Sequence, residues 1–323
     1  MKSIWNNLSE ENILNTVEAL TSIPLNNLCL QRNSYINRVY ELEKQDPRER
    51  LIVKFYRPNR WTKTMILEEH RFVQELAIKD IPVIPPLIIE DKTLFSFNNI
   101  PFTIFPKKGG RALDELDDET WIALGRLIAR IHVSGAQHKK STRITWRPSE
   151  ATQRHLAILL AHPHIPEDFV NPLKTMTELF IKKADPLFNK QDFILLHGDC
   201  HKGNLIHRPG EGTYILDFDD MCFGPPIQDL WMLLSGPIEH ARQEFNLILE
   251  GYEMFRAFPY QSVKIVPSLR AMRIIHFASW CAIQSSDPDF NHHFPEWGTP
   301  RYWNGLIRDL QSIVYSDLEQ PNI

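Results

Sequence analysis

The sequence predicts a two-lobed α+β fold, in which a small β-rich N-lobe (residues 1–107) precedes a larger, mostly helical C-lobe (residues 108–323). Short strand-like apolar runs dominate the first part, and amphipathic helical patterns dominate the second. Between them, the string from Pro106 to Gly110 breaks both strand and helix and supplies flexible glycines. A chain of 323 residues is long enough for two such units and for a large core without disulfides.

In the N-lobe, a helix is expected over residues 9–21, because Ser9 can cap it and the apolar residues that follow share one face. A second helix is expected over residues 62–79, with an apolar stripe that includes Phe72 and Leu76. Alternating apolar runs bounded by turn residues predict the strands of this lobe. They cover residues 28–32, 38–43, 51–56, 94–97 and 102–105.

In the C-lobe, apolar residues recur at helical spacing over most of the length. The expected helices cover residues 119–133, 150–162, 166–184, 226–234, 239–257 and 265–285. Two short strands, at residues 193–196 and 214–216, interrupt this helical region. A cleft between the two lobes is where a nucleotide site is expected.

Composition limits the classes of partner. The chain is 43% hydrophobic and 24% charged with a net charge of −4, which is ordinary for a globular protein and favours neither nucleic acid nor a membrane surface. No apolar run reaches the length of a membrane span. The N-terminus becomes acidic at Glu10 and Glu11, unlike a signal peptide.

The four cysteines have no paired spacing. We therefore expect a cytoplasmic monomer with reduced thiols. Cys200 and Cys222 are either inert buried thiols or redox-sensitive ones.

The residues that carry chemistry lie in two nearby strings, His197 to Asn204 and Tyr214 to Asp220. Asp199 follows an apolar strand and is the candidate catalytic base, able to orient a hydroxyl and accept its proton. Asn204 and Asp217 offer an amide and a carboxylate oxygen, which suit Mg²⁺ when phosphates supply further ligands. The spacing from Asp199 to Asn204 equals that of the protein-kinase loop H-R-D-x-x-x-x-N. These residue types at this spacing predict phosphoryl transfer from ATP.

Lys54 lies within the strand over 51–56, where a lysine either faces solvent or contacts the α- and β-phosphates of ATP. A glutamate on the next helix would hold it in place. Glu69 is preferred for this role, and Glu68 remains an alternative. Ser34, in the turn between the first two strands, could add a hydroxyl donor to a phosphate-binding loop, although an ordinary hairpin turn explains the same residues.

Several neighbouring residues leave more than one interpretation. Asp219 could help to hold a second metal ion or face away from the site. His197 and His201 have the spacing of a metal pair, but Gly198 opposes a helix there, so a structural role for His197 is favoured and His201 could lie near the transferred phosphate. Asp229 either interacts with the N-terminus of its own helix or braces the catalytic loop.

With these residues assembled, the chain resembles the protein-kinase-like superfamily, in its phosphotransferase branch of aminoglycoside, choline and homoserine kinases. The motifs are H-G-D-x-H-x-x-N at His197 to Asn204 and I-D-F-D-like residues at Leu216 to Asp219. Longer strings extend the resemblance to the bacterial stress response kinase family, from about residue 26 to residue 285. They lie at residues 33–40, 53–61, 66–70, 105–111, 196–201 and 228–234.

The resemblance implies a protein-kinase-like fold and an ATP- and Mg²⁺-dependent Ser/Thr protein kinase that also phosphorylates itself and acts in a stress response. It implies Asp199 as proton acceptor, Asp217 as a further active-site residue, Asn204 and Asp217 as Mg²⁺ ligands, and Ser34 as an ATP contact. Two departures argue against control by an activation loop. No glycine follows Asp217-Phe218, and no A-P-E motif is present.

The alternatives are a small-molecule phosphotransferase and a non-catalytic ATP-binding module. A metal hydrolase that uses the two histidines is less favoured.

Overall fold

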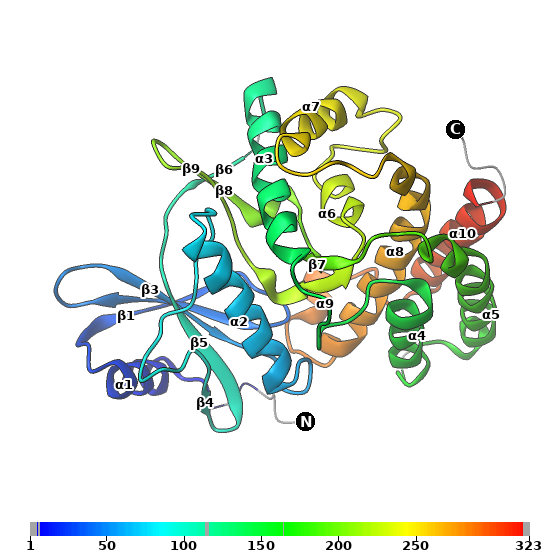
Figure 1. Cartoon of the computed structure of the whole chain (residues 1–323). Coiled ribbons are helices and arrows are strands. Elements are labelled where there is room, and N and C mark those ends of the chain that lie inside the picture. The colour runs from blue at the N-terminus through cyan, green and yellow to red at the C-terminus, as the bar shows by residue number, and fades with distance from the viewer. Residues whose placement is uncertain (1–4, 6, 114–115, 164, 319–323) are drawn as a thin grey trace.

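The computed structural model describes residues 5, 7–113, 116–163 and 165–318 of the chain. The N-lobe is built on one antiparallel five-stranded sheet with the order β1-β2-β3-β5-β4 (Figure 1). Its strands are β1 (Leu25–Arg32), β2 (Arg38–Lys44), β3 (Arg50–Phe55), β4 (Phe95–Phe97) and β5 (Ile100–Pro106). Every strand predicted for this lobe is present, with ends that differ by up to three residues.

Two helices accompany the sheet. Helix α1 (Glu10–Thr21) is capped by Ser9, whose hydroxyl accepts a hydrogen bond from the backbone amide of Asn12, as predicted. Its buried residues Ile13 and Val17 join the apolar core of the sheet. Helix α2 (Lys63–Ile78) instead contributes its apolar stripe to the larger core of the C-lobe. Strand β3, which carries Lys54, and helix α2 therefore pack into different apolar cores.

The C-lobe is mostly helical. Helices α3 and α7 approach closely at Gly125 and Gly251, where a Cβ atom would lie about 2 Å from a backbone carbonyl oxygen of the other helix. The helices are α3 (Asp118–Gly135), α4 (Gln153–Leu160), α5 (Glu167–Ala184), α6 (Ile227–Trp231), α7 (Arg242–Glu253), α8 (Val266–Gln284), α9 (Phe290–His293) and α10 (Pro300–Ser312). Helices α9 and α10 were not expected from the sequence, and α6 and α7 are shorter than predicted.

Two small sheets carry the catalytic strings. Strand β7 (Ile194–Leu196) pairs with β10 (Cys222–Gly224), and β8 (Leu205–Arg208) pairs with both β6 (Arg111–Ala112) and β9 (Gly212–Ile215). Strands β6, β8 and β10 are too short to stand out in the sequence. Strand β5 ends at Pro106, and β6 then joins a C-lobe sheet. The division of the chain at residue 107 itself stays a prediction. Over the described residues, none of the helices combines the length and apolarity that crossing a membrane requires.

Candidate active site

Two adjoining cavities lie between the lobes. The first, here called the sheet-side cavity, has a volume of 410 Å³ and is lined by β2, β3, β5 and the end of β9. Strand β9 leads into the loop of residues 216–220, here called the metal loop because it carries the candidate ligand Asp217. Apolar side chains from both lobes, including Val39, Ile52 and Ile215, form its walls. A cavity of this size, with apolar side chains from a sheet and from a second lobe, suits a nucleotide base.

The second, here called the loop-side cavity, has a volume of 420 Å³ and contains the catalytic loop. It shares Asn33, Ser34, Asn204 and Asp217 with the sheet-side cavity. The two cavities therefore meet at the residues predicted to bind phosphate and metal. Asp199 lines only the loop-side cavity, so the candidate base lies beyond that meeting point.

The Asp199 carboxylate has two side-chain partners, an arginine and a histidine. Its Oδ1 lies 2.6 Å from Nη2 of Arg273 on α8, and its Oδ2 lies 3.4 Å from Nε2 of His201. Burial raises the pKa of this carboxyl group, but the hydrogen bond from His201 and the charge of Arg273 outweigh burial and hold its pKa well below the usual range. Asp199 is therefore ionised at neutral pH and can orient a hydroxyl.

The two candidate metal ligands are fixed to each other through the backbone. The amide of Leu216 donates to the carbonyl of Asn204 at 2.8 Å, which ties the two loops together. The side-chain Nδ2 of Asn204 donates to the carbonyl of Asp199 at 2.9 Å, so its Oδ1 is the atom left for a ligand. Asp217 has a left-handed backbone, with φ of 60°, and its side chain is 54% exposed.

Lys54 contacts the metal-loop carboxylates rather than either helix glutamate. Its Nζ lies 2.8 Å from Oδ1 of Asp217 and 3.4 Å from Oδ1 of Asp219. Glu69 lines the same cavity as Lys54, accepts from the Tyr56 hydroxyl at 3.3 Å and lies 3.9 Å from Arg143. Burial raises the pKa of Glu69, and the nearby charges of Lys54 and Arg143 oppose that rise.

Glu68 points elsewhere. Its Oε2 accepts a 2.8 Å hydrogen bond from the backbone amide of Thr142 and a second one from the Thr142 hydroxyl. Of the two glutamates that the sequence left open, only Glu69 faces the cavity of Lys54. The expected direct contact between Lys54 and Glu69 is replaced by ion pairs to Asp217 and Asp219, because those carboxylates lie closer to the lysine.

The turn that carries Ser34 is attached to the metal loop across the gap between the lobes. Asn37 Nδ2 donates to Oδ2 of Asp219 at 3.2 Å, and Asn37 Oδ1 accepts from the backbone amide of Arg57 at 3.1 Å. Ser34 itself lines both cavities. A phosphate-contacting role for Ser34 stays a prediction that this position permits.

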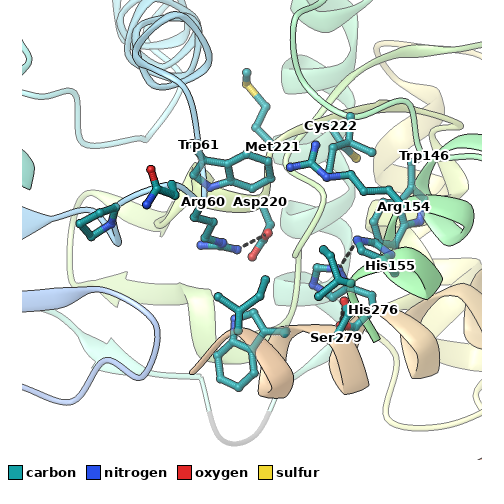
Figure 2. Close-up of a pocket in the computed structure, with 16 residues that line it drawn as sticks. Arg60, Trp61, Trp146, Arg154, His155, Asp220, Met221, Cys222, His276 and Ser279 are labelled. Atoms are coloured by element: carbon teal, nitrogen blue, oxygen red, sulfur yellow. Dashed lines mark hydrogen bonds and ion pairs between the residues drawn. The ribbon is translucent and has the colours of Figure 1, made fainter. Parts of the chain in front are cut away.

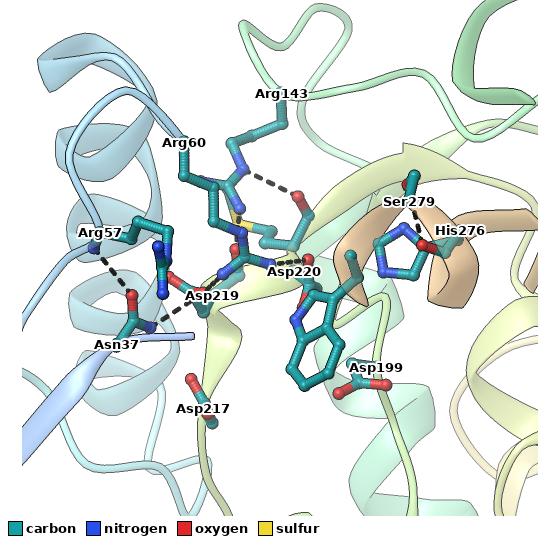
Figure 3. Close-up of polar contacts among 12 residues, drawn as sticks. Asn37, Arg57, Arg60, Arg143, Asp199, Asp217, Asp219, Asp220, His276 and Ser279 are labelled. Atoms are coloured by element: carbon teal, nitrogen blue, oxygen red, sulfur yellow. Dashed lines mark hydrogen bonds and ion pairs between the residues drawn. The ribbon is translucent and has the colours of Figure 1, made fainter. Parts of the chain in front are cut away.

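Asp219 and Asp220 form an ionic network with Arg60, which the sequence did not identify (Figure 3). Arg60 pairs with Asp219 and, at 2.6 Å, with Asp220. Arg143 donates to the backbone carbonyls of Asp219 and of Met221. Asp199 and Asp217 lie on one side of this network (Figure 3). Asp219 therefore links the two lobes through its contacts with Arg60 and Asn37. In the sequence, only its place in the acidic string indicated a role for it.

The catalytic loop is braced from behind by a buried aspartate. Asp229 accepts hydrogen bonds from the backbone amides of His197 (2.9 Å) and Gly198 (2.8 Å), and lies 3.0 Å from Nε2 of His132. His197 Nε2 donates to the carbonyl of Leu216 at 2.7 Å. The bracing interpretation of Asp229 and the structural role of His197 are confirmed. Among the described residues there is no cluster of three or more His, Cys, Asp or Glu side chains that could hold a metal ion.

A third cavity of 340 Å³ lies behind Asp220, here called the Trp61 cavity (Figure 2). The guanidinium groups of Arg60 and Arg154 lie 4.9 Å and 5.9 Å from the centroid of the Trp61 ring. His155 and His276 form the opposite wall, with 3.2 Å between ring nitrogens. This cavity shares Asp220 and His276 with the loop-side cavity.

Comparison with known proteins shows the family to which the chain belongs. The sequence model of the phosphotransferase enzyme family matches residues 30–264. Stress response kinase A of Escherichia coli K12 is 35% identical over 279 residues, covering 84% of this chain and 82% of the relative. A Salmonella typhimurium relative named serine/threonine protein kinase RdoA is 36% identical over 280 residues, with the same coverage.

Solved structures share the fold at low sequence identity. An amicoumacin kinase in complex with AMP-PNP, Ca²⁺ and its ligand superposes with a TM-score of 0.75 at 19% identity, covering 95% of this chain and 93% of that one. Choline kinase LicA from Streptococcus pneumoniae gives a TM-score of 0.64 at 14% identity, covering 94% and 99%. The predicted kinase-like fold, with an N-lobe sheet and a helical C-lobe, is confirmed.

Proposed function

Because this chain belongs to the phosphotransferase enzyme family, we propose that it transfers the γ-phosphoryl group of ATP to serine or threonine hydroxyls of proteins, including its own. The observation that carries the proposal is the meeting of the two cavities at Asn204 and Asp217, with Asp199 just beyond. A nucleotide in the sheet-side cavity then directs its phosphates toward the loop-side cavity, where an acceptor meets the base.

In the transfer step, Asp199 hydrogen-bonds the acceptor hydroxyl and takes its proton. The acceptor oxygen forms a bond to the γ-phosphorus, and the bond from that phosphorus to the β,γ-bridging oxygen breaks, which releases ADP. Lys54 supplies a positive charge at the phosphates, and Ser34 offers a hydroxyl from the turn above them. Asp217 and Asp219 hold Lys54 in position, and Glu69 on α2 lines the same cavity.

The donor set suits Mg²⁺. Asn204 retains a free amide oxygen because its Nδ2 is bonded to Asp199, and Asp217 retains Oδ2 because Lys54 contacts its Oδ1. Two hard oxygen ligands are sufficient when phosphates and waters complete the shell. A bound Mg²⁺ supplies charge neutralisation of the phosphates and helps to align them.

A protein acceptor is supported by the relatives at 35–36% identity, one of which is named a serine/threonine protein kinase. They cover 84% of this chain. We further propose that the protein acts in the cytoplasm as a monomer and contributes to a stress response. The net charge of −4 does not favour nucleic acid as a partner.

The test is a transfer assay with Mg·ATP labelled at the γ-phosphate, comparing wild type with Asp199→Asn. We expect label on serine or threonine of the protein itself and of generic protein substrates. Loss of the base lowers the rate by about 10²- to 10⁴-fold. Asp168→Asn, an exposed aspartate on α5, is the matched control and retains full activity. Labelling that is equal in wild type and Asp199→Asn would contradict the proposal.

A small-molecule acceptor is the second candidate, since the amicoumacin, aminopropanol and choline kinases share the fold over more than nine-tenths of this chain. A screen of hydroxyl- and amine-bearing metabolites, with ADP release as the readout, distinguishes it from the first. Stabilisation by ATP without any turnover would support a non-catalytic nucleotide-binding module instead.

A further inference from the structure

Arg273 occupies the approach to the catalytic base. Its Nη2 lies 2.6 Å from Oδ1 of Asp199, while the other carboxylate oxygen faces His201 at 3.4 Å. A hydroxyl that hydrogen-bonds to Asp199 must therefore arrive next to the guanidinium of Arg273. This arginine has no place in the transfer step described above.

Arg273 lies on the acceptor side of the base rather than on the nucleotide side. The residues common to the two inter-lobe cavities are Asn33, Ser34, Asn204 and Asp217. Arg273 lines the loop-side cavity but not the sheet-side cavity. Its guanidinium is thus separated from the nucleotide by the phosphate-binding residues, and the group it meets belongs to the acceptor.

Two further cavities open from the same arginine. One, the α10 cavity, has a volume of 500 Å³ and is formed between α8 and α10. The other, the α6 cavity, has a volume of 300 Å³ and is lined by residues 231–238 together with Val266, Arg270 and Arg273. Arg273 is therefore the junction of three cavities, and a chain segment bound along them passes over its guanidinium.

The charges on the α6 side of this junction favour an anion, whereas the loop-side cavity holds Asp199, Asp217, Asp219 and Asp220 beside Arg273. The described residues that line the α6 cavity include two arginines, Arg270 and Arg273, and no carboxylate. Glu244, an acidic side chain that contacts this lining, accepts hydrogen bonds from the backbone amide and the hydroxyl of Ser235. In the α10 cavity, Arg273 and Arg301 face Glu296 and Asp309. An anionic group next to the acceptor hydroxyl has a cationic partner here, whereas a cationic group would meet Arg273 at the base.

We propose that Arg273 is the specificity-determining residue for the acceptor, and that it binds a carboxylate or phosphate group carried beside the serine or threonine to be phosphorylated. This inference rests on the proposed protein-kinase function. When the acceptor anion takes the guanidinium, Asp199 exchanges its ion pair for the hydrogen bond of the incoming hydroxyl. Arg273 thereby couples recognition of an acidic segment to freeing of the base.

The test uses the full-length protein with Mg·ATP and synthetic peptides that contain one serine. Glutamate, phosphoserine, glutamine or lysine is placed at each neighbouring position in turn. We expect wild type to prefer the glutamate or phosphoserine peptides over the lysine peptides by about 10- to 100-fold in kcat/KM, the usual effect of one charge-assisted hydrogen bond. Comparison of the glutamate and phosphoserine peptides shows which anion is preferred.

Three variants separate recognition from a structural role. Arg273→Ala should lose the preference by raising KM for acidic peptides, with KM for ATP unchanged, and Arg273→Lys should restore part of it. Arg273→Glu should reverse the preference in favour of lysine peptides, which a misfolded enzyme cannot do. Arg308→Ala, an exposed arginine on the neighbouring α10, is the control and keeps the wild-type preference.

The outcomes that overturn the proposal are distinct. Phosphorylation of all peptides without regard to charge, or an unchanged preference in Arg273→Glu, overturns this inference alone. An equal fall in kcat for all peptides and for hydrolysis of ATP in Arg273→Ala assigns Arg273 to the phosphoryl group and also overturns it. Absence of any protein or peptide phosphorylation by wild type overturns the proposed function, and this inference with it.

Discussion

The carboxylate of Asp229 accepts a 2.9 Å hydrogen bond from the backbone amide of His197, which lies 32 residues earlier in the sequence. Its other oxygen accepts from the amide of Gly198 at 2.8 Å. His197 and Asp229 are both fully buried. Gly198 has a φ of 84°, a backbone conformation that favours glycine. The position of Asp199, the proposed catalytic base, therefore depends on an aspartate on another element.

Replacement of Asp229 by alanine should lower both stability and activity. Each buried amide that loses its acceptor costs about 1–3 kcal/mol, so unfolding by urea should show a loss of about 2–6 kcal/mol for the pair. The transfer rate should fall because the loop that carries Asp199 is no longer fixed.

The control separates loop bracing from an interaction with the helix N-terminus. Asp168 lies in the first turn of α5, as Asp229 does in α6, but is exposed. Asp168→Ala should cost about 0.3–1 kcal/mol at most and leave the rate unchanged. An equal loss in the two variants would mean that Asp229 acts only through its own helix.

The two adjacent glutamates of α2 should differ in their effect on catalysis. Glu69→Gln removes a carboxylate that lines the cavity of Lys54, and we expect kcat/KM for ATP to fall by about tenfold or more, as when a charged partner of a buried site is lost. Glu68→Gln changes a surface contact with Thr142 and should stay within about twofold of wild type. Steady-state kinetics with varied ATP measures both, and equal effects would refute the assignment of Glu69.

The free energy of unfolding should decrease as the pH is lowered below about 6.5, because the fold buries neutral histidines. Burial, followed by the charge of Lys54, lowers the pKa of His70 from 6.5 to about 3. Below pH 6.5 the unfolded chain binds a proton at this histidine while the folded chain does not, so stability is lost as pH falls. For His70 alone the loss between pH 7 and pH 5 is about 2 kcal/mol.

Urea unfolding at both pH values measures this effect. His70→Gln keeps polar atoms near its partners Tyr56 and Thr93, and should reduce the pH dependence by about that amount. His240→Gln, at an exposed position, should leave the pH dependence as in wild type. A His70→Gln variant with the wild-type pH dependence would show that His70 takes up its proton in the folded state.

The four thiols should be unreactive in the native protein. All four cysteines are buried, and burial raises the pKa of Cys29 to about 11 and of Cys281 to about 12. Burial, together with the charge of Asp229, also raises the pKa of Cys200 and of Cys222 well above the usual value. A thiol titration should detect almost no fast-reacting groups until the protein is unfolded. Rapid labelling of Cys200 or Cys222 in the native state would revive the redox hypothesis.

Much of the N-lobe could be predicted from local sequence. Ser9 caps α1 and Thr62 caps α2, because each side-chain oxygen reaches an amide only three residues ahead. The strands β1, β2, β3, β4 and β5 follow from apolar runs between turn residues, which is local information. Helix α10, by contrast, was not predicted, although its buried residues Trp303, Leu306 and Leu310 share one helical face.

The catalytic string itself was equally readable. Asp199 and Asn204 are five residues apart on one loop, and a short loop fixes their relation whatever surrounds it. The sequence likewise predicted Asp217, Lys54 and either Glu68 or Glu69 as site residues, and Asp217, Lys54 and Glu69 line one cavity. These are residues whose chemical type and spacing carry the signal.

The sequence by itself determined the two-lobed architecture and the resemblance to a kinase-like family, and it predicted the residues of the proposed transfer step. Tertiary structure alone decided which charges meet. Lys54 pairs with Asp217, 163 residues away, and Arg60 pairs with Asp219, 159 residues away. Arg273 reaches Asp199 from α8. The energy of an ion pair depends on the distance between the two charges in the folded protein. The sequence around an arginine in a helix does not indicate which carboxylate that arginine will contact.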